Sequence, residues 1–191
     1  MRRQHDGCHN ESNRIMDVWR EFEHNEITHS GAHYLMTVQQ LIEDQGYARV
    51  SDVAREMHIT PGSASIMIKS LREKGYLEED RNRFLLLSEE GNRLAQSVWS
   101  HRQILIAFLK GVLHIDAEQA EIDACKIEHL ISTKTGERLL LFLQFLLSDD
   151  PHGKAFLKSY WDANVLSICD FDSCAVCEEV GECLVIRSES A

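Results

Sequence analysis

From residue 30 onward, apolar residues recur at the spacing of amphipathic helices. In the segment "SGAHYLMTVQQLIEDQG" they lie about one helical turn apart, at Leu35, Val38, Leu41 and Ile42. The segment ends at Gly46, and glycine is typical of the left-handed residue just past a helix. The pattern therefore predicts a first helix that ends at this glycine.

The next stretch predicts two short helices joined by a tight turn. Ser51 and Asp52 can cap the first of them. Thr60 followed by Pro61 places a capping hydroxyl before a proline at the first helical position, and the second helix should end at Gly75. Two short helices in this arrangement form a helix-turn-helix.

The segment "YLEEDRNRFLLL" contains two short extended runs around a polar turn, which is typical of the hairpin that a winged helix adds. The helix over residues 61–74 is then the recognition helix. Candidate DNA-contacting residues on its exposed face and at the hairpin tip are Ser63, Ser65, Lys69, Arg72, Arg81 and Arg83. The alternative is a helix-turn-helix that serves only as a packing unit.

Charge does not oppose this interpretation, although the whole chain carries a net charge of -11. Over residues 46–85, seven Lys and Arg oppose six Asp and Glu. The acidic groups gather at residues 78–80, after the recognition helix, and the field at the DNA surface matters more than the total charge. We expect the chain to bind double-stranded DNA.

After residue 88 the pattern is helical. The predicted helices are "SEEGNRLAQSVWSHRQILIAFLKGVL", "DAEQAEIDACKIEHLIS", with Asp116 as its cap, and "KTGERLLLFLQFLL". The last helix is apolar nearly all round, which predicts burial in the protein or in a dimer.

Three residues of the second of these helices can carry chemistry. Cys125, Glu128 and His129 stand at i, i+3 and i+4, so their side chains share a helix face. A thiolate, a carboxylate and an imidazole that converge can hold a transition metal. The alternative is an amphipathic helix with a small core cysteine and two solvated polar residues.

The cysteines are concentrated at the end of the chain. Residues 148–191 hold nine Asp and Glu against three Lys and Arg, and contain the spacing C-x4-C-x2-C-x5-C, formed by Cys169, Cys174, Cys177 and Cys183. Four cysteines within fifteen residues favour metal or redox chemistry over a disulfide framework. We expect an iron-sulfur cluster or a structural Zn²⁺ there, with four free thiols as the remaining alternative.

Composition and the lengths of the apolar runs argue against a secreted or a membrane-spanning protein. A chain of 191 residues that is 43% hydrophobic predicts one main globular domain or two small ones. The N-terminus "MRRQHDGCHN" has no apolar core of the kind that a secretory signal needs, and the longest apolar run, at residues 139–147, is too short to span a bilayer. We therefore expect a cytoplasmic protein that does not enter a membrane.

The segments "GYARVSDVAREMHITPGSASIMIKSLREKGYL", "HRQILIAFL" and "DACKIEHLIS" together resemble the diphtheria-toxin-repressor and manganese-transport-regulator family of metal-dependent transcriptional repressors. The resemblance covers about residues 30–147. It implies a mainly α fold and a homodimer without enzymatic activity or a small-molecule substrate. It also implies an operator that is bound when metal is bound.

The resemblance also implies a ligand set. Cys125, Glu128 and His129 match the family's ligand triplet, and His101 matches its histidine on the long helix. His33 falls where the iron-responsive members have methionine and the manganese-responsive members have aspartate. Further candidate metal residues are Met36, at a glutamate ligand of the manganese-responsive members, and Glu121, at a second-site histidine of the iron-responsive ones. Leu105 replaces a second-site glutamate, which indicates a weakened or rebuilt second site.

Four segments are expected: a polar extension (1–29), a winged helix-turn-helix DNA-binding domain (30–87), a helical metal-binding and dimerisation domain (88–147) and the cysteine-rich tail (148–191). Histidines of the extension are interpreted as solvated: His5, His9, His24 and His29.

Together, the patterns and the resemblance predict a dimeric repressor of metal-uptake genes. A thiolate among imidazoles favours Fe²⁺, with Mn²⁺, Zn²⁺ and Ni²⁺ as alternatives. The competing hypothesis is a redox or iron-sulfur-sensing protein whose tail cysteines are the main sensor or an electron-transfer site.

Overall fold

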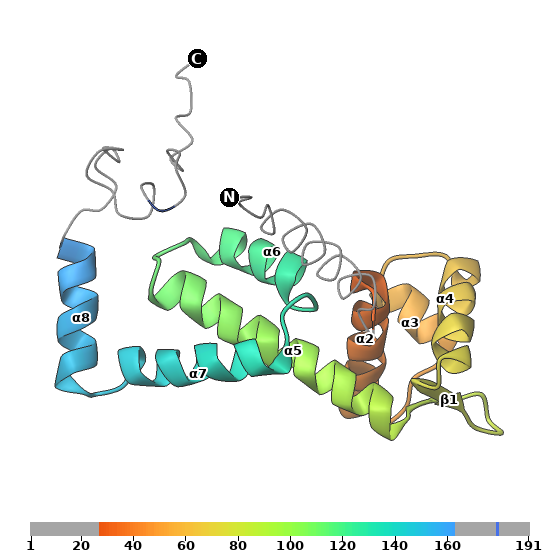
Figure 1. Ribbon diagram of the computed structural model, residues 1–191. Helices are drawn as coiled ribbons and strands as arrows, with labels where there is room; N and C mark the ends of the chain where they lie inside the picture. Colours follow the sequence, from red (N-terminus) through yellow and green to blue (C-terminus); the bar gives the residue numbers. More distant parts are fainter. Residues whose placement is uncertain (1–26, 163–178, 180–191) are drawn as a thin grey trace, which may run out of the picture. The chain divides into compact units, whose positions relative to one another are not determined.

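The computed structural model describes residues 27–162 and residue 179, and these residues are mainly helical. The chain divides into two compact units, residues 1–140 and residues 141–191. Among the described residues, the first helix is α2, which carries part of the candidate site (Figure 1).

Helix α2 spans His29–Gln45 and has the ends that the sequence predicts. The side chain of Thr28 accepts a hydrogen bond from the Gly31 N–H at 3.2 Å, so the N-terminus is capped. At the other end, Gly46 has a φ of 82°, which confirms the predicted left-handed residue.

The helix-turn-helix consists of α3, Val50–Glu56, and α4, Pro61–Glu73. Thr60 caps α4 with Pro61 in its first turn, as predicted. The predicted capping of α3 by Ser51 and Asp52 is wrong, because the helix begins at Val50. Asp52 is instead buried inside α3, where Arg55 donates to its Oδ1 at 2.9 Å.

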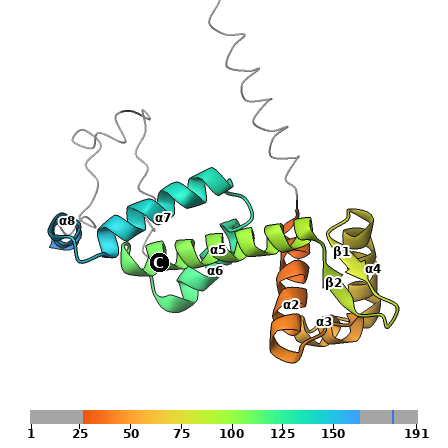
Figure 2. The ribbon, with the colours of Figure 1, turned by 90° about the horizontal axis from the view of Figure 1, so that it is seen from below.

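The predicted wing is confirmed as an antiparallel hairpin of β1, Leu77–Glu79, and β2, Leu85–Leu87. In its turn, Oδ1 of Asp80 accepts hydrogen bonds from the Asn82 and Phe84 N–H groups, each at 2.8 Å. Figure 2 shows the hairpin beside α4, so the wing and the recognition helix belong to one surface.

One hydrophobic core joins these elements to the start of the next helix. Leu35 and Val38 of α2 pack in it with Val53 of α3, Ile68 of α4 and Leu85 of β2. Their exposed fractions are between 0 and 3%. Because α2 shares this core with the recognition helix, a displacement of α2 would be transmitted to α4.

Helix α5, Glu89–Gly111, packs against α2 and also against α6, Ala117–Ile127. Figures 1 and 2 show it passing from the winged helix to α6. Asp116 caps α6 as predicted, by accepting from the Gln119 N–H at 3.0 Å. The predicted continuation of this helix to residue 132 is wrong, because α6 ends at Ile127 and Glu128 is its C-cap.

Helix α7 spans Thr133–Leu147, close to its predicted range. A further helix, α8, spans Pro151–Asp162, where the sequence was interpreted as a linker and tail. Asp150 explains its start, since its Oδ1 accepts from the N–H groups of His152 and Gly153 at 2.8 and 3.2 Å. Among the described residues, no helix is long and apolar enough to cross a membrane.

Candidate metal centre

Two histidines at the start of α2 form one side of the candidate centre. His29 and His33 are four residues apart and therefore lie on the same helix face. Their ring centroids are 4.5 Å apart in an edge-to-face arrangement. Thr28 fixes this end of the helix, so the chain presents both imidazoles from an ordered first turn and the turn after it.

The end of α6 forms the other side. Cys125 lies in its last turn, and Glu128 keeps a helical backbone conformation as its C-cap, with φ of -54° and ψ of -33°. Nε2 of His33 lies 3.2 Å from Sγ of Cys125 and 3.8 Å from Oε1 of Glu128. Side chains 92 residues apart along the chain thus meet at the boundary between the DNA-binding domain and the helices that follow it.

Four residues together can offer ligands to one ion. One donor atom from each of His29, His33, Cys125 and Glu128 lies within 4.8 Å of the others. The donors are two imidazole nitrogens, a sulfur and a carboxylate oxygen, which is a set typical of transition-metal sites.

The surroundings of Glu128 show that these residues fit a cation. Its side chain is completely buried, and neither carboxylate oxygen has a hydrogen-bond partner among the described residues. Burial raises the pKa of Glu128 to about 7, and Arg102, whose Nη1 lies 3.5 Å from Oε2, opposes this rise. A buried carboxylate without hydrogen bonds is costly, and a bound divalent cation would remove that cost.

The neighbouring imidazoles are kept neutral. Burial lowers the pKa of His33, and the charges of His29, Arg102 and His129 lower it further. Burial, followed by the charge of His29, also lowers the pKa of His129. Because only a neutral imidazole can bind a metal, both residues are in the form that a ligand requires at neutral pH.

His129 lies at the edge of this group. Its ring centroid is 4.9 Å from that of His29, and its Nδ1 is buried without a hydrogen-bond partner among the described residues. It is not one of the four residues whose donor atoms converge. His129 follows the end of α6, so its direction is no longer set by the helical face that Cys125 and Glu128 share.

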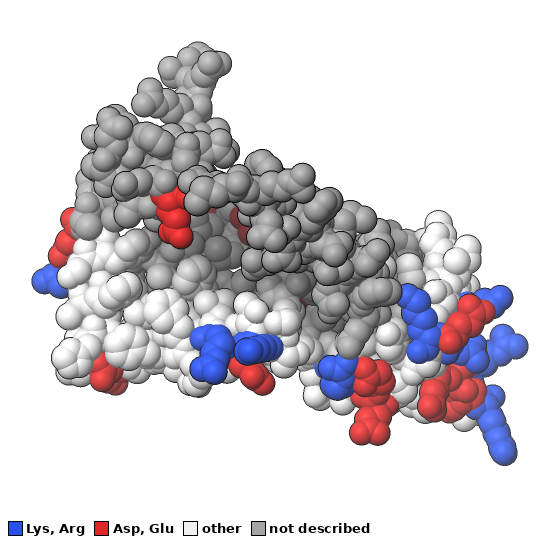
Figure 3. Space-filling model, in the orientation of Figure 1, with Lys and Arg blue, Asp and Glu red and all other residues white. Residues whose placement is uncertain are grey.

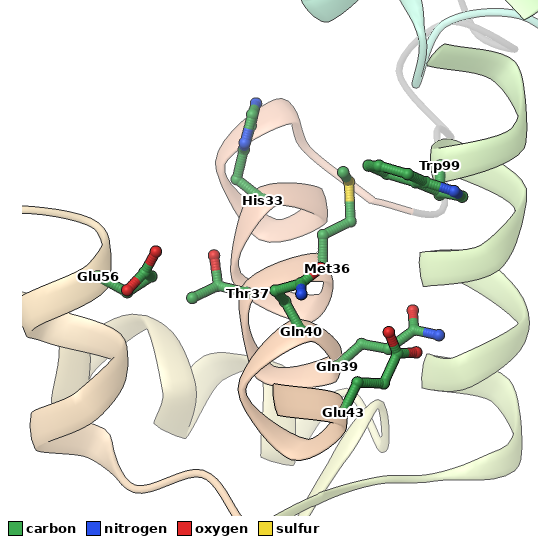
Figure 4. A pocket seen from close by; sticks show the side chains of 8 residues that line it. All are labelled: His33, Met36, Thr37, Gln39, Gln40, Glu43, Glu56 and Trp99. Atoms are coloured by element: carbon green, nitrogen blue, oxygen red, sulfur yellow. The ribbon is translucent and has the colours of Figure 1, made fainter. Parts of the chain in front are cut away.

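The remaining predicted metal residues are not among the four residues whose donor atoms converge. Met36 and His33 both line a pocket of about 300 Å³, and Figure 4 shows the Met36 side chain extending toward Trp99. His101 is buried, with Nδ1 3.0 Å from the backbone carbonyl oxygen of Glu128. Glu121 is exposed and accepts a hydrogen bond from Arg102 at 3.1 Å.

His101 nevertheless stabilises the backbone that carries one of the candidate ligands, Glu128. Only its Nδ1–H can donate to a carbonyl, so it holds the backbone at Glu128. Its other nitrogen is packed against α7, because a Cβ added at Gly136 would lie 2.7 Å from Nε2. The glycine therefore permits the close approach of α7 to His101.

The predicted DNA-contacting residues are all exposed on α4 or at the tip of the hairpin. Ser63 hydrogen-bonds the Thr60 hydroxyl at 2.9 Å, and the Ser65 hydroxyl donates to the Pro61 carbonyl at 2.8 Å. Arg72 is ion-paired with Glu79 of the wing. Figure 3 shows Lys and Arg side chains gathered at the winged-helix end of this face, with acidic side chains among them.

Nζ of Lys69 lies 3.8 Å from Oε1 of Glu73 on the same helix, whereas Arg81 and Arg83 are exposed at the hairpin tip. The two wing arginines are therefore the more accessible cations for phosphate contacts.

The four tail cysteines that the sequence predicts to bind a cluster or Zn²⁺ lie outside the described residues: Cys169, Cys174, Cys177 and Cys183.

Sequence reasoning missed two residues that the structure places at the centre. His29 is exposed, as the sequence interpretation has it, yet one of its ring nitrogens also lies within 4.8 Å of the other three donor atoms; the spacing His-x3-His at a helix start is a signal for a shared face. The other is Arg102, which directly follows His101 in the sequence. Nothing in the sequence alone indicates that its guanidinium turns toward Glu128.

A winged helix whose first helix meets candidate metal ligands from a following helical domain is the arrangement expected of a metal-dependent DNA-binding regulator. Comparisons with known families agree. Residues 26–85 match the family described as "Iron dependent repressor, N-terminal DNA binding domain". Residues 88–157 match "Iron dependent repressor, metal binding and dimerisation domain". The chain belongs to this family of metal-dependent transcriptional repressors, which includes the diphtheria-toxin-repressor and manganese-transport-regulator group, and it is not an enzyme.

Individual relatives cover the same region. The HTH-type transcriptional regulator MntR of Bacillus subtilis is 31% identical over 121 residues, which are 63% of this chain and 84% of that protein. MntR of Shouchella clausii is 33% identical over 112 residues, or 59% of this chain and 78% of that protein. The structure of the manganese regulator SloR is 26% identical with a TM-score of 0.54, over 60% of this chain and 53% of that one. This chain thus spans about half the length of that solved structure.

Proposed function

We propose that the protein is a homodimeric repressor of metal-uptake genes that binds a palindromic operator when Fe²⁺ occupies the centre. The ligands in this proposal are His29, His33, Cys125 and Glu128. The observation that carries it is the convergence of two α2 side chains with two from the end of α6 within 4.8 Å.

The geometry supports a switch because the two sides of the centre belong to different parts of the fold. The histidines are on α2, which shares a core with the recognition helix, whereas the other two ligands are held at the end of α6. A bound ion would tie these elements together and restrict the positions of α4. The coupling free energy between metal binding and operator binding should be about 1–3 kcal/mol, which is the usual range for allosteric proteins.

The donor set supports iron over manganese. Two imidazoles and a thiolate are softer than the oxygen-rich sets that suit Mn²⁺. Some relatives are described as manganese regulators, and one solved structure of this fold is described as a complex with manganese. The Cys125 thiolate is the feature of this chain that favours a softer ion. Zn²⁺ and Ni²⁺ bind such sites more tightly than Fe²⁺ in general, so selectivity for iron would rest on its supply in the cell.

DNA binding in this proposal follows from a two-fold dimer. Each protomer presents one α4 to a major groove, so half-sites should be about 34 Å, one helical turn, or a multiple of this apart. Ser63 and Ser65 would face base edges, and Lys69, Arg72, Arg81 and Arg83 would meet phosphates. Dimerisation is supported by exposed apolar side chains in the second unit, among them Leu141, Phe142, Phe145 and Leu147.

A metal-dependent selection of duplexes tests this function. Full-length protein, prepared without oxygen, is used to select binding sites from a random duplex pool in the presence of Fe²⁺ and, separately, of a chelator. We expect a palindrome to be enriched only with Fe²⁺, and Cys125→Ser and Glu128→Gln to abolish the enrichment. Glu118→Gln, an exposed change on the same helix, should leave it intact. Enrichment that is unchanged by the chelator would contradict the proposal.

The competing redox hypothesis rests on the tail cysteines. Deletion of residues 163–191 separates the two ideas, because it removes all four of these cysteines and leaves every proposed ligand of the centre in place. We expect the shortened chain to retain metal-dependent operator binding. Loss of the metal response together with a visible absorption band of the full chain would favour the tail as the sensor.

A further inference from the structure

Arg102 places a permanent positive charge beside the candidate centre. Its side chain leaves α5 toward the end of α6 and is 21% exposed. Nη2 donates to Oε2 of Glu121 at 3.1 Å, and Nη1 lies 3.5 Å from Oε2 of Glu128. The guanidinium therefore lies between an exposed carboxylate and a completely buried one.

The two oxygens of Glu128 consequently face different partners. Oε1 lies 3.8 Å from Nε2 of His33, on the side of the converging ligands. Oε2 faces Arg102. Because the carboxylate is buried without hydrogen bonds, these neighbours decide which of its oxygens is free for an ion.

The α5 side chains near Arg102 offer few other ligands. Leu105 is buried and apolar, and Nδ1 of His101 is engaged by the carbonyl of Glu128. The charge balance also favours a single divalent ion at this site. A thiolate at Cys125 and a carboxylate at Glu128 balance one divalent ion, while Arg102 balances Glu121. A second divalent ion would add two uncompensated charges next to a fixed guanidinium.

We propose that Arg102 is a built-in cation of the centre, which holds Oε2 of Glu128 together with Glu121 and restricts each protomer to one divalent ion at this site. The inference rests on the proposed metal centre and adds its stoichiometry. Arg102 acts as a positioning residue, since it sets which oxygen of Glu128 meets the ion. Removal of the guanidinium frees Oε2 of Glu128 and the Glu121 carboxylate, which are hard ligands, for a second ion.

Cobalt(II) titration of the full-length protein without oxygen tests this inference. The readout is the number of ions bound per protomer, by elemental analysis after dialysis, and each variant is compared with the wild-type chain so that ions in the tail cancel. Glu128→Gln should remove one ion. Arg102→Met should add one ion, whereas Arg102→Lys, which keeps the charge, should add none. Arg93→Met, on the same helix and ion-paired with Glu90, is the matched control and should also add none.

Two results would overturn the inference. One is an unchanged stoichiometry in Arg102→Met, or in Arg102→Gln if the methionine variant lacks the native far-UV circular dichroism. The other is the loss of two ions in Glu128→Gln, because it would show that the wild-type centre already holds a pair. If instead neither Cys125→Ser nor Glu128→Gln changes cobalt binding, the metal centre itself is wrong, and the failure is distinguishable from that of Arg102.

Discussion

Glu128→Gln should stabilise the metal-free protein at alkaline pH, although it removes a metal ligand. The wild-type side chain is completely buried, and its pKa is raised from 4.5 to about 7. The folded state therefore binds this proton more tightly than the unfolded state does, and wild-type stability falls as the pH rises from about 4.5 through about 7. Glutamine has nearly the same shape and cannot ionise, so the variant escapes this loss.

The size of the effect follows from the pKa. One pKa unit corresponds to about 1.4 kcal/mol, so the rise from 4.5 to about 7 corresponds to about 3 kcal/mol of unfolding free energy. The variant should lead by less than about 1 kcal/mol at pH 5 and by up to about 3 kcal/mol above pH 8. The lowered pKa values of His33 and His129 act in both proteins and largely cancel in the difference.

Urea unfolding in the presence of a chelator, from pH 5 to pH 8.5, measures this difference. Glu118→Gln on the same helix is the control, and because its side chain is exposed it should follow the wild type at every pH. A difference between Glu128→Gln and the wild type that stays constant across this range would refute the reasoning. So would a wild type that is the more stable protein at pH 8.5.

The other predictions concern ligands, DNA and packing. His29→Ala should weaken Fe²⁺ binding by at least about tenfold in an anaerobic competition titration, because it removes one of the converging donors. Changing Arg81 or Arg83 to alanine should weaken binding to all duplexes and reduce the slope of log affinity against log salt by about 1 for each charge. Gly136→Ala should lower the unfolding free energy by about 1–3 kcal/mol, since its Cβ would lie 2.5 Å from Cδ2 of His101.

Each of these has a matched control elsewhere in the chain. His152→Ala removes an exposed histidine of α8 and should leave the Fe²⁺ affinity unchanged. Lys158→Ala removes an exposed charge of the same helix and should not alter the salt slope. A Cβ at Gly62 would meet only Thr60 Oγ1, at 3.9 Å, so Gly62→Ala should not destabilise the fold. A control that changes as much as its partner would contradict the corresponding prediction.

Most of the secondary structure could be predicted because its signals are local. The left-handed Gly46 and the caps Thr60 and Asp116 act within four residues, and each has its predicted role in the structure. Helix α8 was missed although Asp150 and Pro151 repeat the arrangement that starts α4, a capping side chain followed by proline. The polar composition of this stretch favoured the interpretation as a linker.

The candidate centre could be predicted only in part. Helical spacing brings Cys125 and Glu128 to one face, but His129 follows the helix end, so the same spacing does not fix its direction. The path of Arg102 across to Glu128 depends on how α5 packs against α6. Such tertiary contacts are not encoded in any short segment, which is why the position of His101 behind Glu128 was also not foreseen.

Anomalous diffraction from crystals of the full-length protein grown anaerobically with Fe²⁺ tests the central claim most directly. We expect one strong iron peak per protomer at this boundary, in contact with side chains of α2 and with Cys125 and Glu128. We further expect the peak to disappear in Glu128→Gln and to persist in Glu118→Gln. Iron bound only to residues of the tail, or a peak that Glu128→Gln leaves in place, would contradict the account.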